Sequence, residues 1–516
     1  MSTGEGALHQ AVERLREGLT ALSRHDQAEG QMELAPVDAL DVVGDLFGLT
    51  NFERGLLMLC AAAQLDAAVA ERCREHTSAP APSFALASRL LADGHLSALH
   101  PVRPLRWWRL LDSGGASPGP WTPLQIDPRI LHQLLGMPHI DERLDGIVQP
   151  LSPPPWSLPS LVEQGRAVAL RLGHHHGDSP VVVLGGAESS TLRAVAYEAT
   201  GALGLDGFAI RAADLPREPE ARQQLARLWC REVLLSGGLL LVDTEGGGDS
   251  VAVEHFVASL DAPVLLLGAS NGVARVRPTH VVEVRPPTTV EVLERWRGDS
   301  GQGQAWSRGV TEALSDYRLG LHQLEAVRRE LIEAAPVDHA QVARGACRAQ
   351  VRGGLDGLAQ PLDVRASWDD LVLPQGQRDQ LQQIIDHVRH RHRVYETWGL
   401  ADKGTRGLGI CALFHGASGT GKTTAAEAVA GVLDLALYRV DLSQVVSKYI
   451  GETEKKLERI FTAADGAGVV LLFDEADALF GRRTEVRDSH DRYANIEVSY
   501  LLQRIETYRG LALLTS

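Results

Sequence analysis

The sequence predicts a multidomain α/β protein in which an αβα sandwich occurs twice, preceded by a smaller α+β domain. Three observations lead to this fold class. A glycine-rich loop at residues 412–424 lies between a short apolar run and an Ala-rich helix. A second apolar run, residues 469–474, ends in adjacent acidic residues. A shift of about 230 residues aligns this part of the chain with the part before it. Such a repeat predicts duplicated structural units.

Length and composition set the bounds on domain count and partners. The 516 residues predict about three domains, and 44% hydrophobic with 23% charged residues is typical of globular proteins. The net charge of −15 argues against broad affinity for nucleic acids or anionic membranes. The sequence shows no signal peptide and no apolar run of about 18 residues. We therefore expect a cytoplasmic protein without a membrane partner. The five scattered cysteines are expected to be buried thiols.

The first 155 residues divide into a leader and a small domain. Residues 1–35 are predicted to form a loose helical leader. Residues 36–155 are predicted to form the small domain. Within it, Thr50 and Glu53 have capping-box spacing directly before an apolar helix.

The remainder of this small domain predicts two strands, 105–111 and 122–126, around a Gly/Pro/Ser loop. Helices followed by a two-stranded hairpin are the outline of a winged helix. Arg103, Arg106 and Arg109 lie near the predicted wing, which would suit DNA. Because no helix is densely basic, we favour a protein-interaction module and keep DNA binding as the weaker alternative.

The middle segment, residues 156–353, is interpreted as a degenerate copy of the C-terminal one. A buried strand runs into Gly186, which aligns with Gly416, and the strand 238–243 mirrors the strand 469–474. Amphipathic periodicity predicts a helical lid from residue 286 to about 353. The run His174–His176 could hold a metal, but adjacent histidines lack helical spacing, so we interpret it as a solvated loop.

The middle copy has lost the residues that carry chemistry in the other. Thr191, Leu192 and Arg193 stand where the C-terminal copy has a glycine, a lysine and a threonine. Leucine offers phosphates no charge, and the turn loses its glycine. We expect an architectural role for this copy.

The loop at 412–424 has the full P-loop pattern between a predicted buried strand and a helix. Its glycines let backbone N–H groups surround a phosphate chain, and the helix N-terminus adds positive charge. Lys422 is expected to contact the β- and γ-phosphates of ATP, and Thr423 to hold Mg²⁺. The predicted nucleotide-binding residues are Gly416, Ala417, Ser418, Gly419, Thr420, Gly421, Lys422, Thr423 and Thr424.

The acidic pair after the second apolar run predicts the metal and water chemistry of an ATPase. Asp474 would hold Mg²⁺, and Glu475 would activate the attacking water as general base. Together with Lys422, Glu475 is the predicted catalytic residue. Two acids at a strand end can also begin a capped helix, but the P-loop about 50 residues upstream argues against that reading.

Between these motifs lies a basic–aromatic–aliphatic–glycine stretch, Lys448, Tyr449, Ile450 and Gly451. It resembles the first pore loop of the AAA branch of AAA+ ATPases, such as the relatives of katanin and spastin. The extended acidic motif at 474–480 matches the same branch, and residues 481–490 would suit a second pore loop. The resemblance covers residues 366–516. It implies a ring, usually a hexamer, that hydrolyses ATP and grips a protein client. Tyr449 and Ile450 could instead be core residues, but the surrounding charges favour exposure.

The order of a winged-helix-like unit, a degenerate copy and an intact copy looks like bacterial AAA ATPases, some of them encoded with contractile injection systems. The sequence ends at Ser516, one residue before the position expected for a sensor asparagine, whose counterpart in the middle copy is Asn271. We therefore expect a fragment that hydrolyses ATP poorly. An ATP-dependent scaffold that threads nothing is the alternative to a remodeller, and a DNA-acting ATPase is the weakest interpretation.

Overall fold

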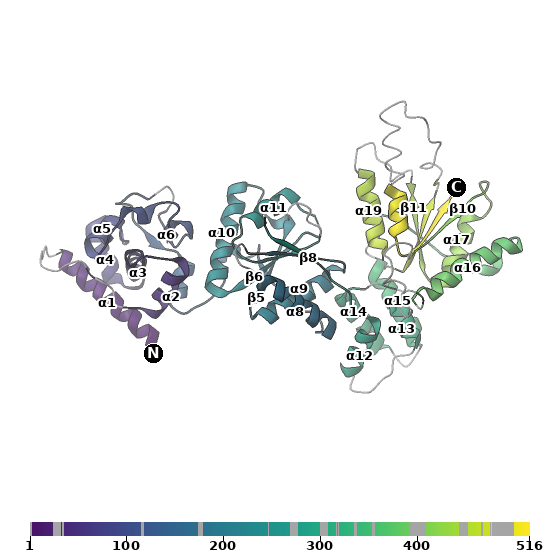
Figure 1. The fold of residues 1–516 in the computed structure, drawn as a ribbon, viewed down its shortest axis with the longest axis horizontal. Coiled ribbons are helices and arrows are strands. Elements are labelled where there is room, and N and C mark those ends of the chain that lie inside the picture. Colours follow the sequence, from purple (N-terminus) through teal and green to yellow (C-terminus); the bar gives the residue numbers. More distant parts are fainter. Residues whose placement is uncertain are drawn as a thin grey trace, which may run out of the picture. The chain divides into compact units, whose positions relative to one another are not determined.

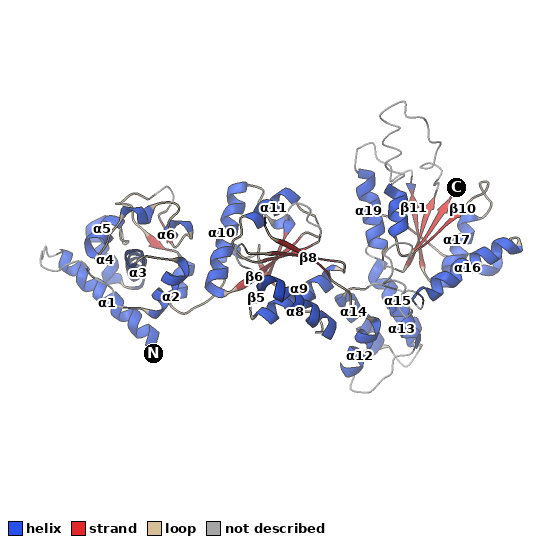
Figure 2. Ribbon diagram, in the orientation of Figure 1, coloured by secondary structure: helices blue, strands red, loops and turns tan. Residues whose placement is uncertain are grey.

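The computed structural model places most of the chain in helices and parallel strands (Figures 1 and 2). The described residues are 3–23, 32, 36–114, 118–173, 179–245, 247–268, 277–299, 308–315, 317, 319–334, 338–352, 355, 357–392, 394, 409–442, 452–465, 468–474, 476 and 500–516. They form two compact units. The first holds residues 1–153 and 161–285, and the second holds residues 154–160 and 286–516.

The N-terminal part of the first unit is built around helix α3, which contacts α1, α2, α4 and α5 (Figure 1). Leu56, Leu57, Met58 and Leu59 are all fully buried, so α3 is enclosed on every side. The elements of this part are α1 (Thr3–Ser23), α2 (Asp38–Phe47), α3 (Asn51–Leu65), α4 (Ala67–Thr77), α5 (Phe84–Leu90), η1 (Leu96–Leu99), α6 (Pro104–Trp107), β1 (Leu111–Asp112), β2 (Gln125–Ile126), α7 (Pro128–Leu134) and η2 (Glu142–Leu144).

The start of α3 confirms the predicted capping box. Glu53 donates its backbone N–H to the Thr50 hydroxyl at 3.3 Å, and its carboxylate accepts the Thr50 N–H at 2.9 Å. The leader is helical as expected, but it is not loose. Leu15 and Leu19 of α1 are fully buried in the core of this part. The prediction of a loose leader was wrong because the apolar stripe of α1 packs against α3 and α4.

The predicted strand at 105–111 is also wrong over most of its length. Pro104 begins the short helix α6, since its missing N–H and fixed φ suit a first helical turn. Arg109 has a φ of +51° and turns the chain, so only Leu111 and Asp112 reach β1. The antiparallel hairpin β1–β2 therefore pairs two residues per strand, much less than the expected wing.

The rest of the first unit is a six-stranded sheet in the order β3-β5-β6-β7-β4-β8. Strands β4 to β8 are parallel and β3 is an antiparallel edge. Helices α8 and α9 lie on one face, and α10 and α11 lie on the other (Figure 1). The elements are β3 (Gln149–Pro150), α8 (Pro159–Gly173), β4 (Val181–Gly185), α9 (Ser189–Leu203), β5 (Asp206–Arg211), η3 (Ala212–Asp214), α10 (Pro219–Ser236), β6 (Gly238–Asp243), α11 (Ser250–Ala258), β7 (Val264–Leu267) and β8 (Thr279–Glu283).

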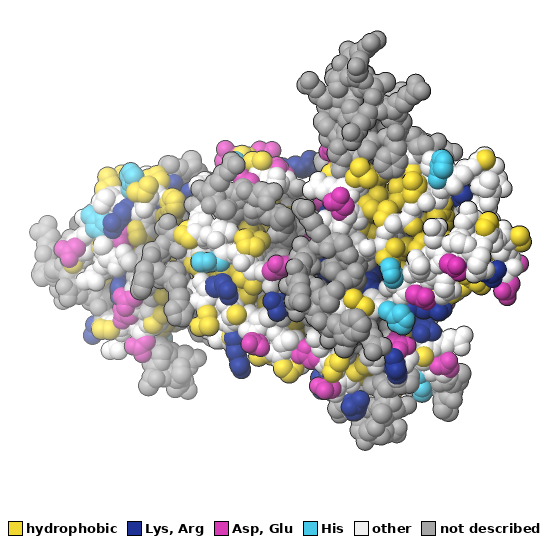
Figure 3. Space-filling view, turned by 45° about the vertical axis from the view of Figure 1, so that its right-hand side comes forward, with side chains coloured by type: hydrophobic (Ala, Val, Ile, Leu, Met, Phe, Trp, Pro, Cys, Tyr) yellow, Lys and Arg dark blue, Asp and Glu magenta, His cyan; other side chains and the backbone are white. Residues whose placement is uncertain are grey.

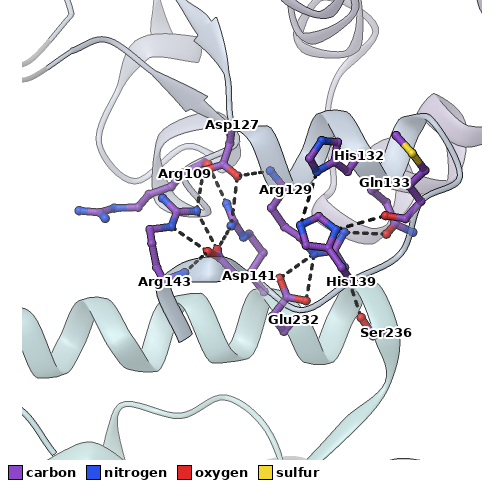
Figure 4. Close-up of polar contacts among 12 residues, drawn as sticks. Arg109, Asp127, Arg129, His132, Gln133, His139, Asp141, Arg143, Glu232 and Ser236 are labelled. Carbon is purple, nitrogen blue, oxygen red and sulfur yellow. Dashed lines mark hydrogen bonds and ion pairs between the residues drawn. The ribbon is translucent and has the colours of Figure 1, made fainter. Parts of the chain in front are cut away.

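A buried ion pair fastens α7 to α10 within this unit (Figure 4). Nε of Arg129 donates to the Glu232 carboxylate at 3.0 Å, and the two residues are 2% and 3% exposed. The same guanidinium donates to Gln133 at 2.9 Å and to Ser236 at 3.3 Å. Burial raises the pKa of Glu232, and the charge of Arg129 opposes this shift.

A second buried cluster lies beside this pair (Figure 4). The fully buried Arg231 forms ion pairs with Asp127 at 3.3 Å and with Asp141, and Arg143 reaches both carboxylates at 2.7 Å. Burial alone would raise the pKa of Asp141, but the hydrogen bonds from Arg143 and the charges of both arginines lower it overall. Both carboxylates are thereby compensated in a dry environment.

The second unit begins with four helices and continues into a five-stranded sheet. Its elements are α12 (Thr289–Asp299), α13 (Arg308–Ser315), α14 (Leu321–Glu333), α15 (His339–Arg352), β9 (Gln360–Leu362), η5 (Trp368–Asp370), α16 (Gln375–His392), β10 (Ile410–Phe414), α17 (Lys422–Leu433), β11 (Ala436–Asp441), α19 (Glu452–Ala464), β12 (Val469–Asp474) and β13 (Leu511–Thr515). The predicted lid helices therefore group with the sheet that follows them, not with the one before. Arg348 of α15 pairs with Asp434 at 2.6 Å, and Leu355 lies in the core beneath α19.

The sheet of the second unit has the order β10-β13-β12-β11-β9, again with an antiparallel edge strand, β9. Each strand of this order has a counterpart in the order β4-β7-β6-β5-β3 of the first unit. The pairing register agrees as well, because Asp441 lies opposite Asp474 and Arg211 lies opposite Asp243. Strand β10 is the outer strand and is only half-buried, so the prediction of a buried strand there was wrong about burial.

Candidate functional site

The glycine-rich loop joins β10 to α17 in the expected strand–loop–helix arrangement. Gly419 and Gly421 have φ values of +81° and +85°, which side chains with a Cβ rarely adopt. The ammonium of Lys422 donates to the carbonyl oxygens of Gly416 at 2.7 Å and Ala417 at 3.1 Å. The loop is thus folded around the charge of its own lysine.

The remaining loop residues leave their polar groups accessible. Ser418, Thr420, Thr423 and Thr424 are exposed, and Thr420 donates its hydroxyl to the Ala417 carbonyl at 2.8 Å. The N–H groups of the first helical turn have no partner within a helix. A loop lined by N–H groups at a helix N-terminus attracts anions.

Asp474 lies at the same edge of the sheet as this loop. Strand β13 separates β10 from β12, and in this parallel register Phe414 pairs with Thr515 while Phe473 pairs with Leu514. The carboxyl ends of β10 and β12 therefore meet at one edge, where the αβα architecture commonly binds ligands.

Thr515 and Arg439 both contact the Asp474 carboxylate. The Thr515 hydroxyl donates to Oδ1 at 2.6 Å, and Nε of Arg439 lies 3.1 Å from Oδ2. Sequence reasoning missed both contacts. The available signal was positional, because Arg439 and Thr515 lie near the ends of β11 and β13, and the structure shows that these two strands flank β12.

These residues fit the predicted phosphate and Mg²⁺ groups. Gly419 and Gly421 add no side chains to the loop, and a Cβ on Gly416 would approach the Thr420 hydroxyl to 3.1 Å. Lys422 can exchange its two carbonyl partners for phosphate oxygens. The hydroxyl of Thr423 and the carboxylate of Asp474 are oxygen donors of the kind that Mg²⁺ prefers.

Several predicted residues lie outside the described part of the chain. They are Glu475, the stretch Lys448, Tyr449, Ile450 and Gly451, the segment 481–490, the histidines 174–176 and Asn271. Their predicted roles stay predictions.

The corresponding turn of the middle sheet has a different chemistry. Leu192 is buried, and the guanidinium of Arg193 pairs with the carboxylate of Asp243, which ends β6 as Asp474 ends β12. Gly186 has a φ of +91°, and a Cβ there would lie 2.9 Å from the Val284 carbonyl oxygen. Residues 1–285 contain no lysine, and the guanidinium of Arg193 takes up the Asp243 carboxylate. The middle turn therefore lacks the lysine and the threonine hydroxyl that the loop of the second unit offers.

Burial also affects a neighbouring carboxyl group in the middle sheet. It raises the pKa of Glu245, and the nearby charges of Asp243 and Glu188 raise it further. The charge of Arg193 opposes this rise in the pKa of Glu245.

A cavity of about 290 Å³ lies in the first unit, lined in part by His139, Trp229 and Glu232. It adjoins Asp206 and Gly238, which begin β5 and β6. Asp243 ends β6, so this cavity is not part of the turn that corresponds to the P-loop.

The basic residues near the predicted wing are engaged within the fold. Arg103 pairs with the buried Glu53 at 3.1 Å, and Arg106 donates to the Leu99 carbonyl at 3.3 Å. On the face drawn in Figure 3, the described Lys and Arg side chains are scattered among acidic and apolar ones. Neither observation favours a nucleic-acid surface.

The described residues contain neither a membrane-spanning helix nor a cluster of metal ligands. No helix among them is both long and apolar enough to cross a membrane. Within the same residues, no group of three or more His, Cys, Asp or Glu is placed to hold a metal ion. Four of the five cysteines are buried as expected, whereas Cys411 on the outer strand β10 is exposed.

The match to a protein family lies in the second unit. Residues 412–513 match the family model described as "ATPase family associated with various cellular activities (AAA)". The peroxisomal ATPase PEX6 of Colletotrichum orbiculare is 29% identical over 215 residues, which cover 39% of this chain and 15% of that protein. The proteasome-activating nucleotidase of Aeropyrum pernix is 37% identical over 100 residues, 19% of this chain and 24% of that protein. Cell division protein C of Sulfolobus acidocaldarius is 32% identical over 134 residues, 25% of this chain and 33% of that protein.

The chain thus spans a third or less of the length of these three relatives. The matched segment is an AAA ATPase domain, and the ATPase-named relatives support an ATP-hydrolysing enzyme. Its parallel sheet, with α17 on one face and α19 on the other, fits the P-loop αβα fold (Figure 2).

Proposed function

We propose that this protein is an ATP-driven remodeller of other proteins that works as a ring. The observation that carries the proposal is the P-loop and Asp474 meeting at one sheet edge inside the AAA-matched segment. AAA+ relatives such as the proteasome-activating nucleotidase support a ring that acts on protein, and a hexamer is the state we expect.

In this proposal, different residues of the chain bind the phosphates, hold the metal and accept the proton. The loop amides and Lys422 bind the phosphates, while Thr423 and Asp474 hold Mg²⁺, which would neutralise phosphate charge. Thr515 fixes the orientation of Asp474 through its 2.6 Å hydrogen bond. Glu475 accepts a proton from the attacking water.

The middle sheet is proposed to be a duplicated copy that binds no nucleotide. Its matching strand order supports a common origin with the second sheet, and the Arg193–Asp243 ion pair supports the loss of nucleotide binding. Its role would be architectural. We further propose that the N-terminal helical part, winged-helix-like in element order, is a protein-interaction module, because its wing arginines are engaged internally.

The test is nucleotide binding and hydrolysis by the full chain with substitutions in the loop. Lys422→Ala should abolish binding of ATP and its turnover, since it removes the only side-chain charge of the P-loop. Glu475→Gln should retain binding and lose turnover. The matched control is Lys456→Ala, the same change on an exposed position of α19. Equal ATP binding by Lys422→Ala and wild type would contradict the proposal.

The alternative is a scaffold that assembles on ATP without threading a client, and one substitution separates the two. Tyr449→Ala should leave ATP hydrolysis unchanged and abolish ATP-dependent unfolding of a tagged model substrate. A scaffold would show no such unfolding before or after the change. Retained unfolding by the variant would refute the role of the predicted pore loop.

A further inference from the structure

The contact between Arg439 and Asp474 is unusual for an ion pair in a sheet. Nε of Arg439 lies 3.1 Å from Oδ2 of Asp474. Yet this Nε is buried and donates no hydrogen bond, to Asp474 or to any other described group. The two charges are therefore in contact without a directed bond, which makes the pair weaker than a hydrogen-bonded one. The guanidinium is held by charge and is easy to displace.

The surroundings of the pair also favour exchange. The side chain of Arg439 is 38% exposed and that of Asp474 is 24% exposed. Oδ1 of the carboxylate is already fixed by the Thr515 hydroxyl, so Asp474 keeps its orientation if the guanidinium leaves. The carboxylate is thus positioned independently of its cation.

In the middle sheet, the aspartate that ends the corresponding strand is also paired with an arginine, but this arginine comes from a helix. Asp243 is paired with Arg193, which comes from helix α9. The strand position that corresponds to Arg439 is Ala209. Arg439 pairs with Leu472, two residues before Asp474. In the same way, Ala209 pairs with Leu241, two residues before Asp243.

The two solutions are not equivalent. In the middle sheet the arginine stands at the helix position that Thr423 holds in the second sheet, so no threonine hydroxyl is offered there. In the second sheet the cation comes from β11, and the helix position stays open to a metal.

From this geometry we propose that Arg439 is an exchangeable counter-ion of Asp474 that competes with Mg²⁺. The inference rests on the proposed function, in which Asp474 holds Mg²⁺. Without metal, the guanidinium compensates the carboxylate. With Mg²⁺ and ATP bound, the Asp474 carboxylate would be compensated by the metal, and the half-exposed side chain of Arg439 would turn to solvent. Arg439 therefore raises the Mg²⁺ concentration that the site requires.

The expected effect follows from the strength of a partly exposed ion pair. Such a pair contributes about 1 kcal/mol at most, which corresponds to about fivefold in an equilibrium constant. Replacing Arg439 by a neutral residue should lower the Mg²⁺ midpoint for nucleotide binding by about fivefold. It should also weaken metal-free nucleotide binding, because the carboxylate then faces the phosphates uncompensated.

The experiment is a Mg²⁺ titration of fluorescent ATP-analogue binding to the full chain, with EDTA as the metal-free reference. Arg439→Gln and Arg439→Ala are the neutral variants, and alanine is the residue at the matching position of the middle sheet. Arg439→Lys retains the charge and should retain a midpoint near that of the wild type. Arg459→Gln, the same change at an exposed position of α19, is the matched control.

The outcomes separate this inference from the function on which it rests. A lower midpoint in each neutral variant that is folded, with weaker metal-free binding, supports the exchange. An unchanged or higher midpoint overturns it, as does a Lys variant that behaves like the neutral ones. If Asp474→Asn binds the analogue with the wild-type Mg²⁺ midpoint, the assignment of Mg²⁺ to Asp474 fails instead. Thermal unfolding in EDTA shows which variants are folded, and either neutral variant alone decides the question.

Discussion

The ion pair between Arg129 and Glu232 offers a sharp test of how the first unit is held together. In Arg129→Met, the hydrocarbon part of the side chain remains while the charge is lost. Glu232 is 3% exposed and loses the partner that both of its oxygens contact, at 3.0 and 3.1 Å. Breaking a buried pair from one side costs about 3–5 kcal/mol, since an uncompensated charge stays in the interior. We expect a loss within this range.

A double variant tests whether the loss of stability comes from the unpaired charge of Glu232. In Arg129→Met with Glu232→Leu, both charges are gone and no buried carboxylate is left unpaired. Exchanging a buried ion pair for apolar residues is often neutral or stabilising. The double variant should therefore lie within about 1 kcal/mol of the wild type and be more stable than Arg129→Met alone. As a control, Arg72→Met breaks the exposed pair with Glu75 and should cost less than about 1 kcal/mol.

The measurement must report on the first unit alone. Hydrogen exchange of the α10 amides as a function of urea, read by mass spectrometry, gives the free energy of opening for that helix. The reasoning is refuted if Arg129→Met costs no more than Arg72→Met. It is equally refuted if the double variant is destabilised by the sum of the two single changes.

Three further predictions follow from charges and thiols elsewhere in the described chain. Arg193→Ala leaves the carboxylate of Asp243 without its cation. The free energy of opening measured from hydrogen exchange of the β6 amides should fall by about 2 kcal/mol, less than for a fully buried pair because Arg193 is half-exposed. Unchanged exchange would contradict this. The pKa of Asp141 is lowered in the folded protein, so its ionised carboxylate stabilises the fold at pH values above the ordinary Asp pKa of about 4. This stabilisation is lost as the pH falls through the lowered pKa. The free energy of unfolding of Asp141→Asn should therefore change less in acid than that of the wild type. Burial raises the pKa of Cys73 to about 11, so alkylation at pH 8 followed by mass spectrometry should label the exposed Cys411 first, and rapid labelling of Cys73 would argue against its burial.

Much of the second sheet could be predicted from the sequence because local chemistry determines it. Glycines at 416, 419 and 421 are needed where the backbone takes positive φ or approaches a side chain closely, and an apolar run on each side identifies the strand and the helix. The strand ending in Asp474 was readable for the same reason, because parallel strands are continuous apolar runs.

The features that the sequence did not predict also have physical explanations. The aromatic residues of 105–111 favour a strand, but Pro104 at the first helical position and the positive φ of Arg109 decide the local structure. Arg439 and Thr515 could not be assigned to Asp474, because that contact depends on strand order and register. A sequence shows which residues end the strands and leaves open which strands are neighbours.

The two sheets show how one position in a fold can serve either as structure or as a binding site. Each sheet ends its third parallel strand in an aspartate, and each supplies an arginine to that aspartate. In the middle sheet the half-exposed guanidinium donates a hydrogen bond to Asp243, whose side chain is only 4% exposed, so a directed bond holds the cation on a buried carboxylate. In the second sheet the contact lacks a hydrogen bond and Asp474 is more exposed, so the cation can be exchanged for another. The difference lies in the element that carries the arginine. A helix-borne arginine occupies the position where a threonine would bind the metal, whereas a strand-borne one leaves that position open. This placement explains why the second sheet is the one expected to bind nucleotide.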